Sequence, residues 1–195
     1  MKRSADEGVR FGPRLLLAAY SQGLFPMAEE DGSIHWYDPP IRAVVPLDQV
    51  RTSQRTLRYM RNTPFRCTMD ECFTGVMEAC ADRESTWISE EMVEAYSALH
   101  RDGHAHSVEV WHRGCLVGGL YGVRIGGVFF GESMFSRMPN ASKVAFHTAV
   151  EHLKVTEATL FDVQIINAHT ASLGAVEIDR ASFLHLLFNA IQREY

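Results

Sequence analysis

The stretch "HAHSVEVWHRGCLVGGLYGVRIGGVFFGESMF", residues 104–135, decides the fold class of this chain. Apolar and polar residues alternate along it, and the dipeptides Arg113-Gly114 and Gly126-Gly127 interrupt the alternation. A period of two residues is typical of strands, and such dipeptides are typical of the tight turns that join them. The stretch therefore predicts three consecutive antiparallel strands.

Helix patterns flank these strands. "SEEMVEAYSALHRDG", residues 89–103, has a capping Ser89, glutamates in its first turn and Gly103 as a stop signal. A second helix is predicted near Asn140, followed by the strand "TLFDVQII", residues 159–166, and a last helix. The second helix should bury Phe146, Ala149, Val150 and Leu153, and the last one should carry Leu184, Leu187, Phe188 and Ile191 on one face. This order predicts an α+β fold, similar to the N-acetyltransferase type, with a mixed sheet and flanking helices.

A small N-terminal domain is expected over residues 1–52, and the catalytic domain over residues 53–195. "FGPRLLLAAYSQGLFP", residues 11–26, predicts a short helix because Pro13 suits a first turn and Gly23 suits a left-handed cap. The next residues, "DGSIHWYDPPIRAVVPLD", contain turn residues, two prolines and the apolar patch "RAVV". They predict short strands and loops.

Composition limits the class of protein. The chain has 195 residues, 46% of them hydrophobic, and is long enough to bury a substantial core. No apolar run approaches the length of a membrane span, and the charged start "MKRSADEGVR" lacks the apolar segment of a secretory signal, so a cytoplasmic protein is expected. The four cysteines follow no close paired spacing, which favours free thiols, and no metal site is expected.

Positive charge is concentrated near the N-terminus. Residues 1–66 contain 10 Lys and Arg against 7 Asp and Glu, whereas the rest of the chain contains 9 against 17. If the segment from Ser53 is helical, Arg55, Arg58 and Arg61 share one face and could bind phosphate groups. A solvated helix face with no ligand explains the same pattern equally well.

Three polar residues lie in apolar surroundings. Glu132 interrupts the apolar run in "FGESMFSRMPNASK", residues 130–143, and a charge buried there needs a partner or a function. Asp162 and Gln164 are two apart in an expected strand, so their side chains should point to the same face. An isolated pair of this kind is more often an ordinary polar strand face.

Several motifs resemble one family closely. "GHAHSVEVW", "LVGGLYG", "GESMFSRMPNASK", "HTASLGAVEI" and the Asp162/Gln164 pair resemble the bacterial leucyl/phenylalanyl-tRNA-protein transferases, and the resemblance runs from about Leu15 to Phe183. It implies an enzyme that moves Leu or Phe from aminoacyl-tRNA to the α-amine of proteins beginning with Lys or Arg, which marks them for degradation. The implied partners are Leu-tRNA, Phe-tRNA and such proteins, with no cofactor and no membrane, and we expect a monomer.

The resemblance also implies the reacting residues. It assigns the reacting centre to Asp162 and Gln164, with Asp162 orienting the amide or accepting a proton. It places Glu132 at the bottom of the donor site, where it would bind the donor's ammonium group or order the loop. The alternative for Glu132 is a buried structural pair with a cation such as Arg137.

The implied binding surfaces follow the same motifs. The aminoacyl pocket would consist of Leu120, Met134, Ser136, Phe146, Phe161 and Val163, with Met134 and Ser136 on the same strand face as Glu132. Trp87, Tyr20 and Tyr96 would stack on the terminal adenosine, or else be core aromatics, and Arg55, Arg58 and Arg61 would contact the acceptor stem. Phe161 and Val163 depart from the residues usual in the family and could shift the preference between Leu and Phe.

Further departures and two other functions remain open. Met27 replaces the tryptophan usual after "FP", and the chain begins without the glycine-rich lead-in of many members, which leaves the size of the small domain undetermined. An acetyl-CoA-dependent N-acetyltransferase would share the fold, although "FSRMPNASK" lacks a glycine-rich pyrophosphate loop. A non-catalytic RNA-binding module would explain the arginines but not Glu132, Asp162 and Gln164 together.

Overall fold

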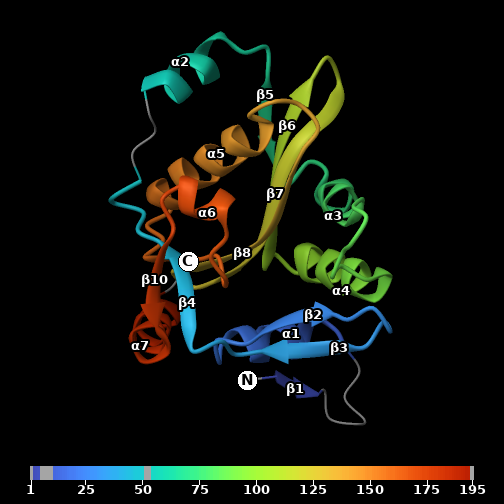
Figure 1. The fold of residues 1–195 in the computed structure, drawn as a ribbon, viewed down its shortest axis with the longest axis vertical. Coiled ribbons are helices and arrows are strands. Elements are labelled where there is room, and N and C mark those ends of the chain that lie inside the picture. The colour runs from blue at the N-terminus through green and yellow to red at the C-terminus, as the bar shows by residue number, and fades with distance from the viewer. Residues whose placement is uncertain (1, 5–10, 51–53, 194–195) are drawn as a thin grey trace.

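The computed structural model describes residues 2–4, 11–50 and 54–193. Within these residues the chain forms a three-stranded sheet in the order β1-β3-β2 and a seven-stranded sheet in the order β10-β4-β9-β8-β7-β6-β5 (Figure 1). The strands are β1 (Lys2–Ser4), β2 (Phe25–Ala28), β3 (Ile34–Tyr37), β4 (Ile41–Val45), β5 (Arg66–Met69), β6 (Ala105–His112), β7 (Cys115–Ile125), β8 (Val128–Ser136), β9 (Leu160–Asp162) and β10 (Val176–Asp179). The helices are α1 (Pro13–Tyr20), α2 (Gln54–Asn62), α3 (Phe73–Ala81), α4 (Glu90–Arg101), α5 (Ala141–Val155), α6 (Ala168–Ser172) and α7 (Arg180–Ile191).

The three predicted strands are confirmed as β6, β7 and β8, which pair antiparallel in sequence order. Both turns use left-handed backbone. Arg113 and Gly114 have φ angles of 51° and 80° in the first turn, and Gly126 has a φ of 53° in the second. Left-handed residues match the twist of paired strands, which is why these dipeptides identify the hairpins.

The predicted helices are also present. The Ser89 hydroxyl accepts a hydrogen bond from the Met92 amide at the start of α4, and Gly103, with a φ of 80°, follows its end. Helix α5 begins directly after Asn140 and buries the predicted face. In α7 the prediction for one residue is wrong: Phe188 is 68% exposed, because Phe183, Leu187 and Ala190 form the buried face.

The strand predicted over residues 159–166 is shorter in the structure. Strand β9 ends at Asp162, and Gln164 takes a left-handed φ of 57°. Strand β9 runs parallel to β8 only as far as the pair Phe130 and Asp162, and β8 then continues alone to Ser136. The two strands therefore part at the centre of the sheet. The short elements α6 and β10, which follow this point, were not predicted.

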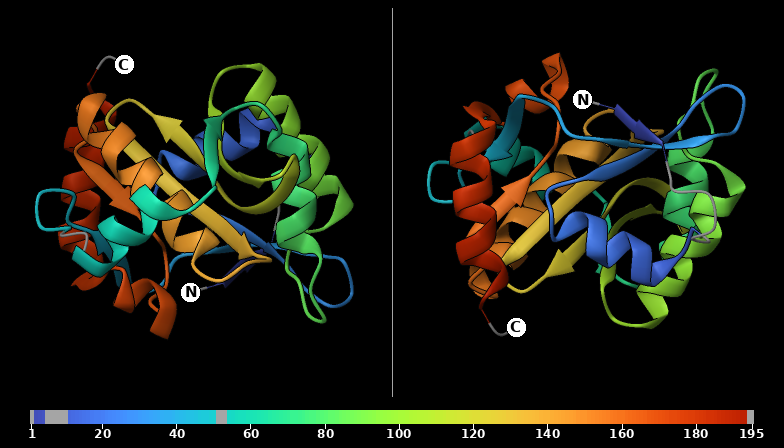
Figure 2. Two further views of the ribbon diagram at one scale, coloured as in Figure 1. Left: turned by 90° about the horizontal axis from the view of Figure 1, so that it is seen from above. Right: turned by 90° about the horizontal axis from the view of Figure 1, so that it is seen from below.

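Helices cover both faces of the large sheet. Helix α5 packs on β6 and β7 on one face, while α3 and α4 lie on the other (Figure 2). Gly118 of β7 permits the close approach of α5, because a Cβ atom there would lie 2.5 Å from the Cβ of Ala141. The first turn of α5 is thereby held against the sheet.

The N-terminal unit combines α1 with the small sheet and lies beneath one end of the large sheet (Figure 1). Strand β4 already pairs with β9 and β10, so the chain enters the large sheet at residue 41. The expected domain boundary at residue 52 concerns which part of the chain folds independently, and it stays a prediction. In the part of the chain that the structure describes, no helix is long and apolar enough to cross a bilayer.

Candidate active site

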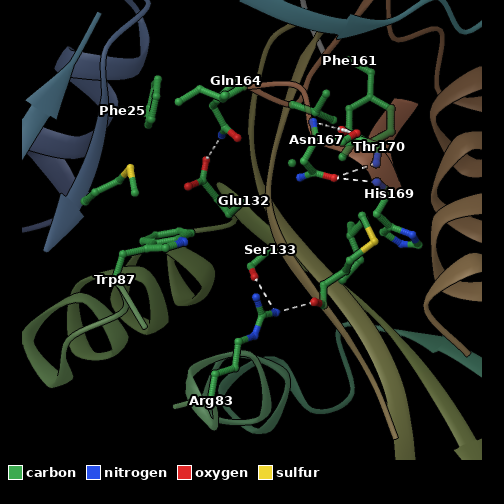
Figure 3. Close-up of a pocket in the computed structure, with 16 residues that line it drawn as sticks. Phe25, Arg83, Trp87, Glu132, Ser133, Phe161, Gln164, Asn167, His169 and Thr170 are labelled. Carbon is green, nitrogen blue, oxygen red and sulfur yellow. Dashed lines mark hydrogen bonds between the residues drawn. The ribbon is translucent and has the colours of Figure 1, made fainter. Parts of the chain in front are cut away.

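A pocket opens where β8 and β9 part (Figure 3). Its volume is about 330 Å³, within the range of sites for small ligands. The residues that surround it come from β2, the segment between α3 and α4, β7, β8, β9, the segment after β9, and α6. They are Phe25, Met27, Arg83, Trp87, Leu120, Gly131, Glu132, Ser133, Met134, Phe161, Val163, Gln164, Ile165, Asn167, His169 and Thr170. Separate parts of the chain thus converge on one cavity.

Four of the predicted apolar pocket residues line this cavity, namely Leu120, Met134, Phe161 and Val163. Gly131 lets the Phe161 ring lie against β8, since a Cβ atom at this glycine would be 2.7 Å from the ring. These side chains form an apolar wall of the pocket, and Glu132 lies beside it as a polar floor.

Glu132 lies on a β-bulge. Tyr121 pairs with Ser133 and Gly122 pairs with Gly131, so Glu132 is the extra residue of β8. A bulge shifts the alternation of side chains by one residue. The prediction that Met134 and Ser136 share the face of Glu132 is therefore wrong: Met134 packs with the core beneath α5, whereas Glu132 meets Tyr96 on the opposite face.

Glu132 forms the floor of the pocket and has polar neighbours. Its Oε1 accepts a hydrogen bond of 2.8 Å from Gln164 Nε2, and its Oε2 lies 3.5 Å from the Tyr96 hydroxyl. The hydroxyls of Tyr20 and Tyr96 also share a hydrogen bond. The alternative pairing with Arg137 is wrong, because that guanidinium binds Asp82 at 3.3 Å.

The surroundings of Glu132 favour its neutral form. Burial raises the pKa of this carboxyl to about 8, and the hydrogen bond from Tyr20 and the charge of Arg42 oppose the rise only in part. Asp162 adds to the rise through its negative charge. The carboxyl is therefore largely protonated at neutral pH and can gain or lose a proton near the pKa of an α-amine.

Asp162 is held quite differently. Its carboxylate accepts hydrogen bonds from Arg42 Nε at 2.9 Å, from Arg42 Nη2 at 2.6 Å and from the backbone N–H of Gln164 at 2.9 Å. Both ion-pair partners are almost completely buried, and Asp162 does not line the pocket. A carboxylate with these contacts is a structural anion, so the geometry opposes its predicted use as a proton acceptor.

Arg42 connects three parts of the chain. Besides binding Asp162, it donates to the Gly23 carbonyl at 2.9 Å, and its guanidinium lies 4.7 Å and 4.5 Å from the ring centroids of Phe25 and Phe183. The N-terminal unit, β9 and α7 are thus joined at one buried cation. Sequence analysis missed Arg42, although an arginine inside the apolar patch "IRAVV" is a signal that a buried carboxylate lies opposite.

Gln164 connects the two carboxylates. Its backbone N–H donates a hydrogen bond to Asp162 Oδ1, and its side-chain Nε2 donates one to Glu132 Oε1. The left-handed φ of 57° produces this arrangement, so the two residues are not neighbours on one strand face as predicted. The prediction that Asp162 orients Gln164 is nevertheless consistent with these contacts.

Several predicted binding residues lie elsewhere. Tyr20 and Tyr96 have no exposed surface, so their rings offer no face to an adenosine and instead surround Glu132. Phe146 is fully buried behind Phe161, with ring centroids 5.6 Å apart. Ser136 lies outside the pocket, where its hydroxyl donates to the Met138 carbonyl. These predictions fail because position in a motif does not reveal depth in the core.

The rim of the pocket is aromatic and polar. Trp87 is half-buried, and its carbonyl accepts a hydrogen bond of 3.0 Å from the Ala28 amide, which links its segment to β2. Arg83 donates to Ser133 Oγ at 3.2 Å and to the Met134 carbonyl at 2.6 Å (Figure 3). Burial and the charge of Lys143 lower the pKa of His169 on the opposite rim. Neither Arg83 nor His169 was predicted.

The predicted basic helix exists as α2, at the end of the large sheet far from the N-terminal unit (Figure 1). Arg58 and Arg61 are exposed on it, and the Tyr59 hydroxyl donates to the Pro139 carbonyl at 2.9 Å. The side chain of Arg55 lies outside the described residues. The helix is thus fixed next to the loop that leads into α5.

Comparison with known proteins agrees with this geometry. Residues 44–188 match the family model for leucyl/phenylalanyl-tRNA protein transferase, and residues 10–40 match the model for its N-terminal domain. A protein of Herpetosiphon aurantiacus with the name leucyl/phenylalanyl-tRNA–protein transferase is 48% identical over 94% of this chain and 96% of its own. One of the same name from Gloeobacter violaceus is 50% identical over 94% of this chain and 95% of its own.

The fold has a more distant relative among solved structures. FemX aligns with a TM-score of 0.55 and 11% sequence identity, over 92% of this chain and 69% of that chain. This likeness concerns the fold and supports the predicted mixed sheet with flanking helices. The family matches span nearly the whole chain and agree with the predicted motifs, so this protein belongs to the leucyl/phenylalanyl-tRNA protein transferase family.

Proposed function

We propose that this protein transfers Leu or Phe from aminoacyl-tRNA to the α-amine of proteins that begin with Lys or Arg. The observation that carries the proposal is the pocket at the parting of β8 and β9, which combines an apolar wall with an ionisable floor. Membership of the family supports the same reaction.

The donor side chain would lie against Leu120, Met134, Phe161 and Val163. An apolar wall discriminates weakly between Leu and Phe but rejects charged side chains, since their desolvation is not compensated. Methionine is flexible, so Met134 and Met27 would adapt to either shape. The terminal adenosine would stack on Trp87, the predicted aromatic residue that the structure leaves open to the pocket.

The chemistry requires little more than positioning and proton transfer, because an aminoacyl ester is already activated. The acceptor's neutral amine would attack the ester carbonyl, the new amide bond would form, and the ester bond to the ribose oxygen would break. Glu132, as carboxylate, would accept the proton lost by the amine and return it to the leaving ribose oxygen. Its pKa near 8 matches the amine, as efficient proton transfer requires.

Gln164 and Asp162 would act as positioning residues. Gln164 Nε2 fixes the Glu132 carboxyl, and Asp162 in turn fixes the Gln164 backbone. This division of roles differs from the prediction that Asp162 itself accepts the proton. It rests on the contacts of Asp162, all of which are made by buried groups.

Further proposals concern the setting of the reaction. We propose a cytoplasmic enzyme that marks its products for degradation and acts as a monomer without a cofactor. Arg58 and Arg61 on α2 are exposed and would contact the phosphates of the acceptor stem, as would Arg55.

The two other functions have less support. For an acetyl-CoA-dependent enzyme, the loop into α5 would need a glycine-rich nest for pyrophosphate, and residues 136–140 of this loop include no glycine. A non-catalytic RNA-binding module would not need Glu132 beside an apolar pocket. Neither proposal accounts for the family membership.

The test is transfer of labelled Leu from Leu-tRNA, with Phe-tRNA in parallel, to matched peptides that begin with Arg, Lys, Asp or Ala. Transfer confined to the Arg and Lys peptides is expected. Transfer to the Asp peptide would support the proposed reaction but would contradict the proposed specificity for acceptors that begin with Lys or Arg. Absence of transfer by folded protein with intact charged tRNA would overturn the proposed reaction, and binding of acetyl-CoA would then be measured.

A further inference from the structure

A second cavity adjoins the aminoacyl pocket at the first turn of α5. It measures about 420 Å³, and Arg83, Met134 and His169 line both cavities. Its other walls include Arg137 and Ser142. The reaction proposed above makes no use of this second cavity.

Ser142 is the unusual residue here. It is only 7% exposed, and it lines the cavity. Its backbone amide binds Ser136 Oγ at 3.2 Å, but among the described residues no hydrogen bond involves its own hydroxyl. The Ser142 side chain is thus more than nine-tenths buried, and its hydroxyl, which has no protein partner among the described residues, can donate a hydrogen bond to an acceptor atom of a ligand in the cavity.

Positively charged side chains line the same cavity as this hydroxyl. The guanidinium groups of Arg83 and Arg137 line the cavity from α3's end and from the loop after β8, and the 15-residue helix α5 directs the positive end of its dipole toward it. Lys143 lies close enough to influence His169 on the shared wall. Asp82 is the opposing charge, bound to Arg137 at 3.3 Å with both side chains more than half exposed.

The place of the cavity indicates which anion it would bind. On one side it shares residues with the aminoacyl pocket, and on the other the loop at Pro139 is bound by Tyr59 of α2. Exposed Arg58 and Arg61 belong to that helix. A nucleic acid strand that extends from the pocket toward α2 along this loop would pass the cavity, and its phosphates would lie near arginines at each stage.

We propose that Ser142, Arg137 and Arg83 form a phosphate subsite for the RNA strand just upstream of the terminal adenosine. This inference rests on the proposed donor and adds a second point of attachment close to the reacting ester. The subsite uses side chains in place of a glycine-rich nest. It would fix the position of the adenosine, whereas α2 binds the more distant stem.

The test uses stable donor analogues. The probe is 3'-deoxy-3'-(leucylamino)adenosine joined at its 5' oxygen to cytidine by either a phosphodiester or an uncharged methylphosphonate. With wild-type protein we expect the phosphodiester to bind about tenfold more tightly, a difference of about 1.4 kcal/mol, because only the charged phosphate attracts the two guanidinium groups. Ser142→Ala and Arg137→Met should each reduce this ratio, and Asp82→Asn, which removes the opposing charge, should raise it.

Arg101→Met is the matched control, since it removes an exposed arginine at the end of α4 that lines neither cavity, and it should leave the ratio unchanged. Equal binding of the two analogues by wild-type protein, or a ratio that none of the three cavity variants changes, would overturn the subsite. Failure of the unextended leucylamino-adenosine to bind would instead overturn the proposed donor. Circular dichroism and the unfolding midpoint of each variant exclude misfolding as the cause of a lost ratio.

Discussion

Asp162 is a fully buried carboxylate and Glu132 is a partly buried one that lines the pocket, and their surroundings give them different properties. Asp162 has a fully buried arginine at 2.6 Å and an amide donor at 2.9 Å. Glu132 has an amide side chain and two tyrosines around it, no cation among the described residues forms an ion pair with it, and desolvation raises its pKa to about 8. Asp162 thus has a charged partner in direct contact, whereas the surroundings of Glu132 favour its neutral form.

This difference indicates how the roles are divided. A carboxylate paired with a buried arginine stabilises the junction of three chain segments, and the Asp162 carboxylate is already bound by three N–H donors and does not line the pocket. A carboxyl that titrates near the pKa of an amine is suited to exchange a proton with it. The structure therefore moves the reacting role from Asp162 to Glu132, and each prediction below tests that division.

The largest effect is expected for Arg42→Met. The substitution leaves Asp162 as a buried charge without its partner, which should cost about 3–5 kcal/mol in the free energy of unfolding. Urea denaturation measures this loss. The double variant Arg42→Met/Asp162→Leu should regain much of it, since no buried charge remains, and a stable single variant would contradict the structural role of the pair.

Glu132→Gln should affect catalysis and leave the fold intact. The neutral amide has the size of the protonated carboxyl but cannot accept a proton, so kcat should fall by about 10²- to 10⁴-fold. Single-turnover transfer from Leu-tRNA measures the change, and exposed Glu177→Gln on β10 is the matched control. A Glu132→Gln enzyme with normal kcat would return the proton transfer to another group.

The pH dependence should sharpen the same comparison. Because the pKa of Glu132 is raised from 4.5 to about 8, the folded state retains a proton that the unfolded chain releases, and stability should fall as the pH rises between these values. Transfer activity should rise over the upper part of this range as the carboxylate forms. Glu132→Gln should flatten this part of the stability profile, and an unchanged slope would contradict the raised pKa.

Arg58→Ala is expected to have the smallest effect on turnover, because α2 lies far from both carboxylates. Loss of one phosphate contact should weaken tRNA binding and lower the slope of log K against log salt by about one unit. Filter binding at several salt concentrations measures this slope. Turnover of bound Leu-tRNA should stay at the wild-type value, and a lower turnover would place α2 within the reacting geometry.

Local patterns predicted the parts of the fold that local physics controls. The turn dipeptides after β6 and β7, the Ser89 cap and the apolar face of α5 depend on a few neighbouring residues, and all are confirmed. The strand after α5 was predicted too long, because a pattern of alternating residues does not reveal the left-handed Gln164 that ends it. The elements α6 and β10 are too short to give a periodic signal.

The residues of the site, like the elements of the fold, were predicted from the sequence only in part. The sequence motifs identified Glu132, Gln164, Trp87 and four apolar wall residues that the structure brings into one pocket. They also included Tyr20, Tyr96 and Phe146, which lie in the core, because the distance of a side chain from the surface depends on packing between distant elements. Arg42 and Arg83 were missed, since their partners lie far away in the sequence.

The sequence by itself determined the family, the three central strands and the residues from which a donor site could be made, since motifs, turns and periodicity are written in neighbouring residues. Only the tertiary structure decided which carboxylate is paired with an arginine and which has a raised pKa. The bulge that turns Glu132 toward Tyr96, and the arginine 120 residues away that binds Asp162, are products of chain packing. The charge of a buried group depends on what surrounds it in space, and its neighbours in the sequence do not contain that information.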